Sequence, residues 1–395
     1  MTDLGRPGVV AELRRRIGRG GPVTFAEFME VALYWPDGGY YMAGEPWGRG
    51  GDYVTSLDAG EVFAAAVTVQ LFEMWRRLGS PGRFTLVEAG AGRGRFGLGV
   101  ARCAESRYRD FHDALHVRLV DRRYGGGLGP EMDGAQAGDG GEGPGAKVSL
   151  HEGLDGLGTV EAGCLISNEL VDALPVHRVV GSEDGLREIY VDYRQGRGFF
   201  EVAGPPSTPE LADFLSTVGA GALPPGWRAE VGLEAARWIG GAAAVLERGY
   251  VLTVDYGFPA AELYGPARRG GTLRCHHRHR VCDDPYVRVG EQDITAHVDF
   301  TALSLYGRRA GLEVEGFTTQ HYFLLALGIL EELEEVGGGP GEIEKIRRNQ
   351  AVKGLLMPGG MGSVFKVLVQ RKGGAAGKGP LRGFSMRDMS SALHL

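Results

Sequence analysis

The sequence predicts an α/β protein with an open and mostly parallel sheet. Short apolar runs at residues 84–89, 116–121 and 163–169 have the length and composition of buried strands, and segments with helical spacing separate them. This alternation is typical of parallel sheets covered by helices. Each run ends in polar residues, and so does a later run that ends at Asp255. Because ligands bind beside the carboxyl ends of strands in such sheets, the sequence also predicts a ligand site there.

Helices are predicted before and between these strands. Residues 8–34, 61–78 and 96–107 place apolar side chains at helical spacing. Within the first of these segments, Thr24 is a candidate N-cap because Glu27 follows three residues later, as in a capping box.

The predicted organisation has three parts. A helical amino-terminal segment with a cleft loop covers 1–80, the main α/β domain covers 81–372, and a disordered tail covers 373–395. The main domain contains two insertions, of which 178–235 alternates strand patterns with turns and is expected to be antiparallel, and 256–300 is the other. The tail is rich in glycine and has little apolar surface to bury.

Composition excludes several classes of protein. The formal net charge of −7 disfavours a nucleic-acid partner held by bulk electrostatics. The four cysteines are widely spaced, which disfavours a zinc ribbon or a disulfide scaffold and indicates reduced thiols. No apolar run approaches the roughly 20 residues of a membrane helix, and residues 1–30 have no signal-peptide core. We therefore expect a cytoplasmic protein without membrane insertion.

A glycine-rich loop after the first core strand is the main candidate for cofactor binding. Residues 88–94 read Glu-Ala-Gly-Ala-Gly-Arg-Gly, which is the form typical of S-adenosyl-L-methionine sites. Glycine lets the backbone turn sharply and bring its N–H groups against a ligand. The candidate cofactor residues are Glu88, Gly90, Ala91, Gly92, Gly94 and Asp121.

Two other interpretations of the loop remain open. Residues 92–97 also match the G-x-G-x-x-G pattern of dinucleotide sites, and the loop can also be a tight turn without a ligand. The register favours the methyl donor, because the strand ends near Ala89 and Gly97 then lies within the following helix. Asp121 ends the next strand and can accept hydrogen bonds from ribose hydroxyls of either cofactor, so it does not discriminate.

Several blocks together resemble the MidA family of methyltransferase-like proteins, which are tied to the assembly of mitochondrial respiratory complex I. The resemblance covers roughly residues 23–370. The blocks are "FMEVALYWPDGGYYM", "GRGGDYVTS", "LVEAGAGRGR", "ISNELVDALPVHR", "LTVDYGF", "GTLRCHHRHRVCDDPY", "GEQDITAHVDF" and "MGSVFKVLVQ".

This resemblance implies a class I (Rossmann-like) methyltransferase fold with a seven-stranded sheet and S-adenosyl-L-methionine as cofactor. The mitochondrial member is known as a protein arginine methyltransferase, so the resemblance also implies a protein substrate, with a subunit of complex I as a candidate. The chain departs from the usual family pattern at Ala91, where Pro is usual, at Leu57-Asp58, where Pro-Glu is usual, at Ala64-Ala65, where Gly-Glu is usual, and at Gly99, where Asp is usual.

The stretch "SNELVDALP" carries the candidate catalytic residues Glu169, Asp172 and Asn168. Carboxylates suit a guanidinium, which offers five donors in a planar fork. Glu169 resembles the first glutamate of the double-glutamate loop of arginine methyltransferases. The competing interpretation is that Glu169 caps a following helix that Pro175 limits.

Two other functions stay open at this point. One is methylation of a small molecule or of a different side chain. The other is an assembly factor that keeps the fold and binds its partner without catalysis.

Further candidates line the predicted cleft. Asp52, Tyr53 and Thr55 belong to a loop that is either folded over the cofactor or anchored by its own side-chain-to-backbone bonds. His297 is either a substrate contact or a structural corner, and Asp299 is a candidate N-cap.

Two remaining motifs receive no catalytic role. The histidines of "RCHHRHR" lack zinc spacing, so we expect an exposed basic segment and no metal site. The charged stretch over 331–348 indicates a solvated surface or a homodimer contact.

Overall fold

The computed structural model describes residues 4–43, 60–126, 147–278, 280–333, 341–357, 361–374 and 379–393. Contacts divide the chain into two compact units. We call one the insertion unit, which comprises Met1–Val54, Val171–Trp238 and Gly257–Leu305. We call the other the sheet unit, which comprises Thr55–Leu170, Ile239–Tyr256 and Tyr306–Leu395.

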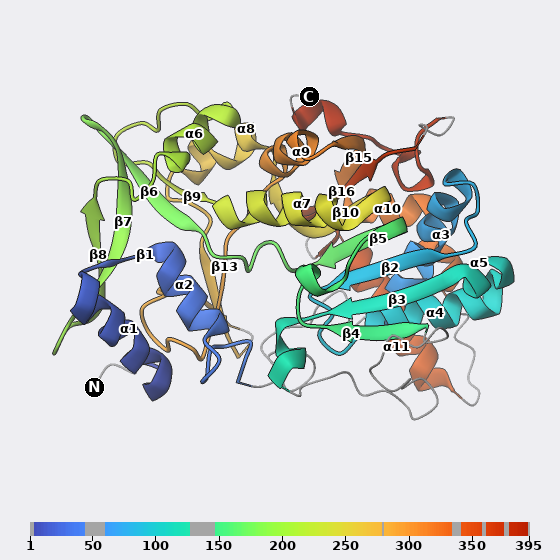
Figure 1. Cartoon of the computed structure of the whole chain (residues 1–395), viewed down its shortest axis with the longest axis horizontal. Helices are drawn as coiled ribbons and strands as arrows, with labels where there is room; N and C mark the ends of the chain where they lie inside the picture. The colour runs from blue at the N-terminus through green and yellow to red at the C-terminus, as the bar shows by residue number, and fades with distance from the viewer. Residues whose placement is uncertain are drawn as a thin grey trace. The chain divides into compact units, whose positions relative to one another are not determined.

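The sheet unit is built on a mixed, mostly parallel sheet. Its strands follow the order β4-β3-β2-β5-β10-β16-β15, with parallel pairing from β4 to β10 and antiparallel pairing at β16 and β15. Figure 1 shows β2, β3, β4 and β5 side by side. Their bounds are β2 (Phe84–Ala89), β3 (Leu115–Val120), β4 (Val148–His151), β5 (Val160–Asn168), β10 (Leu246–Phe258), β15 (Leu312–Thr319) and β16 (Phe365–Lys372).

This arrangement confirms the predicted fold class. The path contains seven strands among the described residues, and the short β14 (Val298–Asp299) pairs with the last residues of β10. All six residues of β2 are buried, as expected for a strand in the middle of a sheet that is covered by helices. No strand was predicted at β4, because this edge strand is short and only partly buried.

Helices of the sheet unit pack on the sheet and on one another. The helix α3 contacts α4 and β5, and the rings of Phe63 and Phe96 lie 5.7 Å apart between the two helices. A Cβ at Gly99 of α4 would lie 2.9 Å from Cβ of Ala64 on α3, so the helices approach closely there. The helices are α3 (Gly60–Arg77), α4 (Arg95–Arg107), α5 (Arg109–Ala114), α10 (Gln320–Ala326), α11 (Glu342–Leu356) and α12 (Met361–Val364), with short 3₁₀ turns η2 (Arg122–Gly126), η3 (Leu154–Gly156), η5 (Ile329–Glu332), η6 (Arg382–Phe384) and η7 (Ser390–Leu393).

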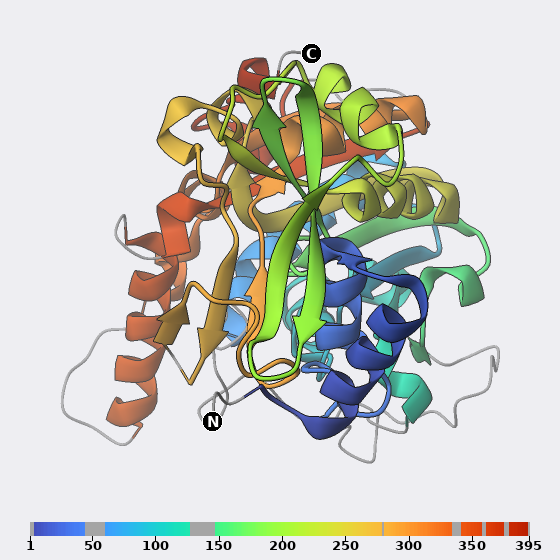
Figure 2. The ribbon, with the colours of Figure 1, turned by 90° about the vertical axis from the view of Figure 1, so that its left-hand side faces the viewer.

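The insertion unit contains the predicted antiparallel strands. Its larger sheet has the order β1-β7-β6-β9 with β8 also paired to β7, and its smaller sheet has the order β12-β11-β13. The helices α1 and α2 lie against β7, beside the long strands in Figure 2. The elements are α1 (Pro7–Gly20), β1 (Val23–Thr24), α2 (Phe25–Tyr34), β6 (His177–Ser182), β7 (Gly185–Arg194), β8 (Gly198–Gly204), α6 (Glu210–Thr217), β9 (Arg228–Val231), α8 (Ala260–Leu263), η4 (Pro266–Arg268), β11 (Arg274–His277), β12 (Arg280–Cys282) and β13 (Asp293–Thr295). Two further helices, α7 (Leu233–Val245) and α9 (Phe300–Arg309), contain residues of both units.

The amino-terminal helical segment is two helices rather than one. Thr24 caps α2 as predicted: its side chain accepts a hydrogen bond from the Glu27 amide at 3.1 Å, and the Thr24 amide donates to Glu27 Oε2 at 3.2 Å. The same cap requires extended backbone at Thr24, which is why the segment breaks before it.

Two parts of the predicted organisation differ from the structure. The helices α1 and α2 belong to the same compact unit as the insertions, whereas α3 belongs to the sheet unit. The tail is not disordered over its described residues 379–393, since Leu381 and Phe384 are buried. These two apolar side chains join the core of the sheet unit, which a glycine-rich composition did not reveal.

The close crossing of α3 and α4 leads to a test by a double-mutant cycle. We expect Gly99→Ala to lower the free energy of unfolding, because the new methyl group clashes with Ala64. This cost should exceed the small gain in helix propensity that alanine brings. Adding Ala64→Gly removes the clash, so the two substitutions should couple favourably by about 1–2 kcal/mol. Urea unfolding of the four proteins measures this coupling. Simple additivity would show that the two positions are not in contact.

Candidate functional site

The glycine loop after β2 has a backbone that few side chains tolerate. Gly90, Gly92 and Gly94 have φ values of 70°, 55° and 68°, in the left-handed region that favours glycine. The amides of Gly90 and Ala91 both donate to the carbonyl of Val120, at 2.9 and 3.0 Å, which ties the loop to the end of β3. The turn thus occupies residues 90–94, and Gly97 lies inside α4, as the predicted register requires.

Glu88 connects the end of β2 to the first turn of α4. Its Oε2 atom accepts a hydrogen bond from the Gly97 amide at 2.8 Å. A Cβ at Gly97 would also lie 2.8 Å from Oε2, so glycine is needed for this approach. Burial of the Glu88 carboxyl raises its pKa to about 8. The group therefore favours its neutral form in the folded protein.

Asp121 follows β3 and faces the glycine loop. Its Oδ2 atom accepts a hydrogen bond from the Gly92 amide at 2.8 Å, and its Oδ1 atom accepts from the backbone N and Nε of Arg123, both at 3.0 Å. The hydroxyl of Tyr124 donates to the Gly92 carbonyl at 3.0 Å. These contacts place one carboxylate beside the backbone that the loop exposes.

The turn after β5 is the second half of the site within the sheet unit. Glu169 has a φ of 53°, one of four non-glycine residues with positive φ in the described chain. Such a conformation costs about 1 kcal/mol or more and often marks a functional position. Its amide donates to the carbonyl of Val254 at 3.0 Å, and Asn168 Nδ2 donates to Glu169 Oε1 at 3.2 Å.

The neighbouring strand β10 fixes this turn. Asp255, which is fully buried, accepts a hydrogen bond from the Leu170 amide at 3.3 Å and from the Tyr256 amide at 2.8 Å. A Cβ at Gly90 would lie 3.1 Å from Cδ1 of Leu170, so the turn after β5 packs on the glycine loop. The structure therefore brings Asn168 and Glu169 next to the loop, as the strand order predicts.

The helix expected after Glu169 does not exist. The chain forms a turn around Asp172, where the Leu174 amide donates to the Val171 carbonyl at 3.3 Å. The left-handed backbone at Glu169 and the ring of Pro175 bound this segment, and too few residues lie between them to form a helix. The interpretation of Glu169 as a helix cap is therefore wrong.

Asp172 and His297 belong to the insertion unit and lie on neighbouring segments. The Asp172 carbonyl accepts a hydrogen bond from the Ala296 amide at 2.9 Å. The next residue, His297, donates its backbone amide to Thr272 Oγ1 at 3.1 Å, and its ring lies 5.3 Å from the ring of Phe258.

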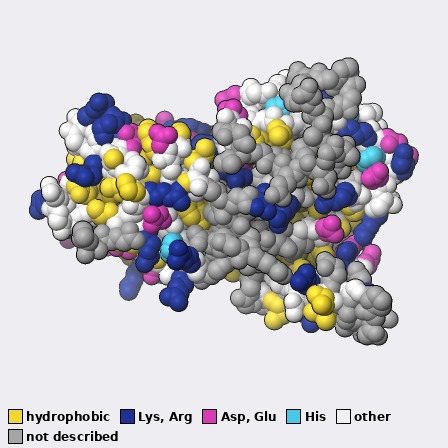
Figure 3. All heavy atoms as spheres, turned by 90° about the horizontal axis from the view of Figure 1, so that it is seen from below, with side chains coloured by type: hydrophobic (Ala, Val, Ile, Leu, Met, Phe, Trp, Pro, Cys, Tyr) yellow, Lys and Arg dark blue, Asp and Glu magenta, His cyan; other side chains and the backbone are white. Residues whose placement is uncertain are grey.

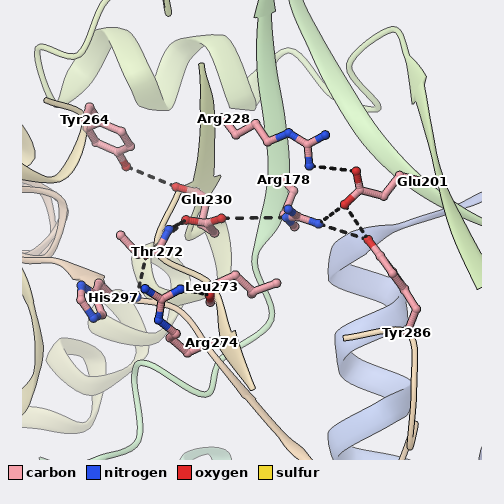
Figure 4. Close-up of polar contacts among 10 residues, drawn as sticks. All are labelled: Arg178, Glu201, Arg228, Glu230, Tyr264, Thr272, Leu273, Arg274, Tyr286 and His297. Atoms are coloured by element: carbon pink, nitrogen blue, oxygen red, sulfur yellow. Dashed lines mark hydrogen bonds and ion pairs between the residues drawn. The ribbon is translucent and has the colours of Figure 1, made fainter. Parts of the chain in front are cut away.

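His297 lines a small pocket in the insertion unit. The pocket lining also includes Glu230, Tyr264 and Thr272. Figure 4 shows how polar contacts extend from there: Glu230 Oε2 accepts from the Thr272 amide at 2.7 Å, and Arg178 lies between Glu230 and Glu201. Glu230 thus joins the pocket lining to further charged side chains of the insertion unit.

Asp299 acts as a helix cap, as predicted. Its Oδ1 atom accepts a hydrogen bond from the Ala302 amide at 2.9 Å at the start of α9. Burial raises the pKa of Asp299 to about 7.

Several residues near these candidates were not singled out from the sequence. Tyr34 donates its hydroxyl to the Ala173 carbonyl at 3.0 Å, and Tyr41 donates to Asp293 Oδ1 at 2.8 Å. The two rings stack with centroids 5.4 Å apart. Both tyrosines lie in the first block that resembles the MidA family, which was the available signal. The candidates Asp52, Tyr53 and Thr55 lie outside the described residues.

The surface carries charges of both signs. In the described part of the face in Figure 3, Lys and Arg side chains lie among Asp, Glu and hydrophobic side chains. Among the described residues, no helix is long and apolar enough to cross a membrane.

The geometry fits S-adenosyl-L-methionine. The glycine backbone leaves room where a side chain would stand, and the Asp121 carboxylate lies beside it. The chain belongs to a family of S-adenosyl-L-methionine-dependent methyltransferases, whose family model matches residues 66–318. The protein is therefore a class I methyltransferase, and the predicted enzyme class, cofactor and family are confirmed.

Individual relatives agree with this assignment. The chain is 29% identical to "Protein arginine methyltransferase NDUFAF7 homolog, mitochondrial" of Drosophila melanogaster, over 97% of this chain and 90% of the relative. It is 28% identical to the NDUFAF7 protein of Xenopus laevis, over 88% and 80% of the two chains. A crystal structure of a Burkholderia thailandensis protein bound to S-adenosyl-homocysteine has a TM-score of 0.82 and 31% identity, covering 97% of this chain and 96% of that chain.

These relatives correct one expectation. The predicted cytoplasmic location is contradicted, because the NDUFAF7 relatives are named as mitochondrial proteins. Location depends on address signals that receptors read, so composition was not a sound basis for that prediction.

The glycine loop can be tested by substitution at Gly92. We expect Gly92→Val to abolish binding of S-adenosyl-homocysteine in calorimetry while the fold is retained, because a branched side chain would stand where the backbone must meet the ligand. Gly158→Val is the matched control, since Gly158 has a φ of 62° against 55° at Gly92 and nothing lies within 4 Å of its Cβ position. Both variants carry backbone strain, but only the first should lose binding. Normal binding by Gly92→Val would show that the loop does not hold the cofactor.

The buried carboxyl of Glu88 predicts a pH dependence of stability. Its folded-state pKa of about 8 is above the ordinary value of 4.5, so the folded protein keeps a proton that the unfolded chain releases. The contribution of the buried, protonated Glu88 to stability is fully present below pH 4.5 and is lost as the pH rises through about 8. We expect the free energy of unfolding to fall by an amount on the order of a few kcal/mol over this range.

Glu88→Gln is the variant that tests this. It keeps an uncharged acceptor for the Gly97 amide, so denaturant unfolding at several pH values should show a flatter profile than the wild type. The exposed Glu161→Gln on β5 is the control and should leave the profile unchanged. If stability depended on pH in the same way in Glu88→Gln and in the wild type, Glu88 would not be the group whose pKa is raised.

Proposed function

We propose that this methyltransferase transfers a methyl group to an arginine side chain of a protein. The single observation that carries the proposal is the strained Glu169 at the carboxyl end of β5, beside the glycine loop. Asn168 donates a hydrogen bond to the Glu169 carboxylate, and the Val254 carbonyl accepts one from the Glu169 amide, so the carboxylate is prepared to meet a cation. The names of the relatives as protein arginine methyltransferases support the same substrate.

We assign cofactor binding to the loop and its two carboxyl groups. Gly90, Ala91, Gly92 and Gly94 would present their backbone to the amino-acid part of the cofactor, and Asp121 would accept hydrogen bonds from its ribose hydroxyls. Glu88 would act by holding the loop in place through Gly97. When bound, S-adenosyl-L-methionine supplies an electrophilic methyl group on a sulfonium.

The chain's own residues would position the acceptor. Glu169 would accept hydrogen bonds from the guanidinium and fix its plane, which leaves one nitrogen aimed along the line of displacement. Asp255 is a positioning residue in this scheme, because it holds the Leu170 amide and thereby the turn that carries Glu169. Within the insertion unit, Asp172 stays a second candidate carboxylate and His297 a candidate substrate contact.

The proposed partner is a protein with an accessible arginine. The resemblance to the MidA family supports a subunit of respiratory complex I as that protein. A homodimer is supported by exposed apolar side chains at Ile343 of α11 and at Met357 directly after it.

The acceptor role of Glu169 is tested with a conservative variant. We expect Glu169→Gln to lower the methylation rate by at least about 100-fold, because the neutral amide loses the charge that orients the guanidinium. Binding of S-adenosyl-homocysteine should be unchanged, since Glu169 would contact the acceptor only. The measurement uses tritiated methyl donor with a lysate of hypomethylated protein, followed by amino-acid analysis for methylarginines.

Glu161→Gln is the matched control on the same strand, and it should leave the methylation rate unchanged because its side chain is exposed. If the label appeared in small molecules or in another amino acid, that acceptor would be the substrate and arginine would not. A protein that binds S-adenosyl-homocysteine, transfers no label and retains a partner after Glu169→Gln would instead be a non-catalytic assembly factor.

A further inference from the structure

Two cysteines lie opposite each other in the three-stranded sheet of the insertion unit. Cys275 of β11 pairs in register with Cys282 of the antiparallel strand β12. The chain has four cysteines, and the other two, Cys103 and Cys164, belong to the sheet unit. We propose that Cys275 and Cys282 are a modification site that forms a reversible cross-strand disulfide.

The backbone already provides the geometry. Directly opposite residues of an antiparallel pair have Cα atoms about 4.5–5.5 Å apart, and a disulfide spans about 4.4–6.8 Å between Cα atoms. Opposite residues also point to the same face of the sheet. Their Cβ atoms are about 4.5–5.5 Å apart before bonding and about 3.5–4.5 Å apart in a disulfide. Forming the bond therefore requires the two Cβ atoms to approach by only about 1 Å.

The two thiols differ in access, which sets an order of reaction. Cys275 is fully buried in the core of the insertion unit, whereas Cys282 packs against that core and is partly exposed. Cys282 therefore meets an oxidant in solution first, and Cys275 closes the bond from within.

The oxidant that we name is a low-molecular-weight disulfide, such as oxidised glutathione. The Cys282 thiolate attacks one sulfur of this disulfide, forms a mixed disulfide and releases one thiolate. Cys275 then loses its proton to solvent and attacks Sγ of Cys282, which forms the Cys275–Cys282 bond and releases the second thiolate. The two cysteines lose two electrons, and the small disulfide gains them.

The bond would act on an edge strand. In the sheet order β12-β11-β13, β12 has β11 as its paired neighbour and β11 is held on its other side by β13. The segment between the two cysteines contains Arg278, with a φ of 49°, and the exposed Arg280. Oxidation would therefore fasten a basic edge to the core of the unit without changing the register.

The proposal is tested on the full-length protein by oxidation and peptide mapping. The reduced protein is incubated with excess oxidised glutathione at mildly alkaline pH, because burial raises the pKa of the Cys275 thiol and slows its ionisation. We expect two of the four thiols to resist alkylation after denaturation. A tryptic digest should contain one linked pair of peptides that carries Cys275 and Cys282, and dithiothreitol should separate it.

Two variants distinguish this disulfide from other oxidation products. Cys103→Ser should leave the linked pair intact, whereas Cys282→Ser should abolish it even if the variant is less stable. A persistent glutathione adduct on Cys282 of the wild type, a link that includes Cys103 or Cys164, or four alkylated thiols would each overturn the proposal. The test does not depend on methyl transfer, so its failure would leave the proposed function unaffected.

Discussion

The hydrogen bond from the Gly97 amide to the buried carboxyl of Glu88 is the contact on which the site depends. It joins the end of the central strand β2 to the first turn of α4, and the five residues of the glycine turn must bridge the short distance between them. A chain so confined needs left-handed backbone at three positions. It also needs glycine inside the helix, where only a hydrogen atom fits beside the carboxyl oxygen. The glycine at position 97 is thus the result of one side-chain contact.

The turn after β5 follows from the same arrangement. Because Leu170 packs on Gly90, the position of the glycine loop limits where this turn can lie. The amides of Glu169 and Leu170 then donate hydrogen bonds to β10, and these bonds fix the backbone of the turn with an unfavourable φ at Glu169. The boundary between the two compact units falls between Leu170 and Val171. Glu169 therefore belongs to the sheet unit, and Asp172 belongs to the insertion unit.

Sequence reasoning was strongest where a single local rule decides the structure. The capping box at Thr24, the cap at Asp299 and the end of β2 before Gly90 were all predicted correctly, because each depends on contacts within a few residues. The order of the apolar strands likewise predicted that Asn168 and Glu169 would lie beside the loop.

The errors came from tertiary context. No local signal marks β4, since its edge position and partial burial depend on pairing with β3. The burial of Phe384 in the tail depends on segments far away in the chain, because it joins the core of the sheet unit. The role of Asp255 in holding Leu170 was also missed, because a polar residue at the end of a buried strand does not reveal which amide it binds.

The contact between Ala64 and Gly99 has a consequence for substitutions at either position. Both positions depart from the usual pattern of the family that it resembles, and in the structure they are neighbours on facing helices. An acidic side chain at position 99 has no room while Ala64 remains, because even its Cβ would lie 2.9 Å from Cβ of Ala64. The order of exchange at the two positions therefore matters, because position 64 has to lose its methyl group before position 99 can gain a side chain.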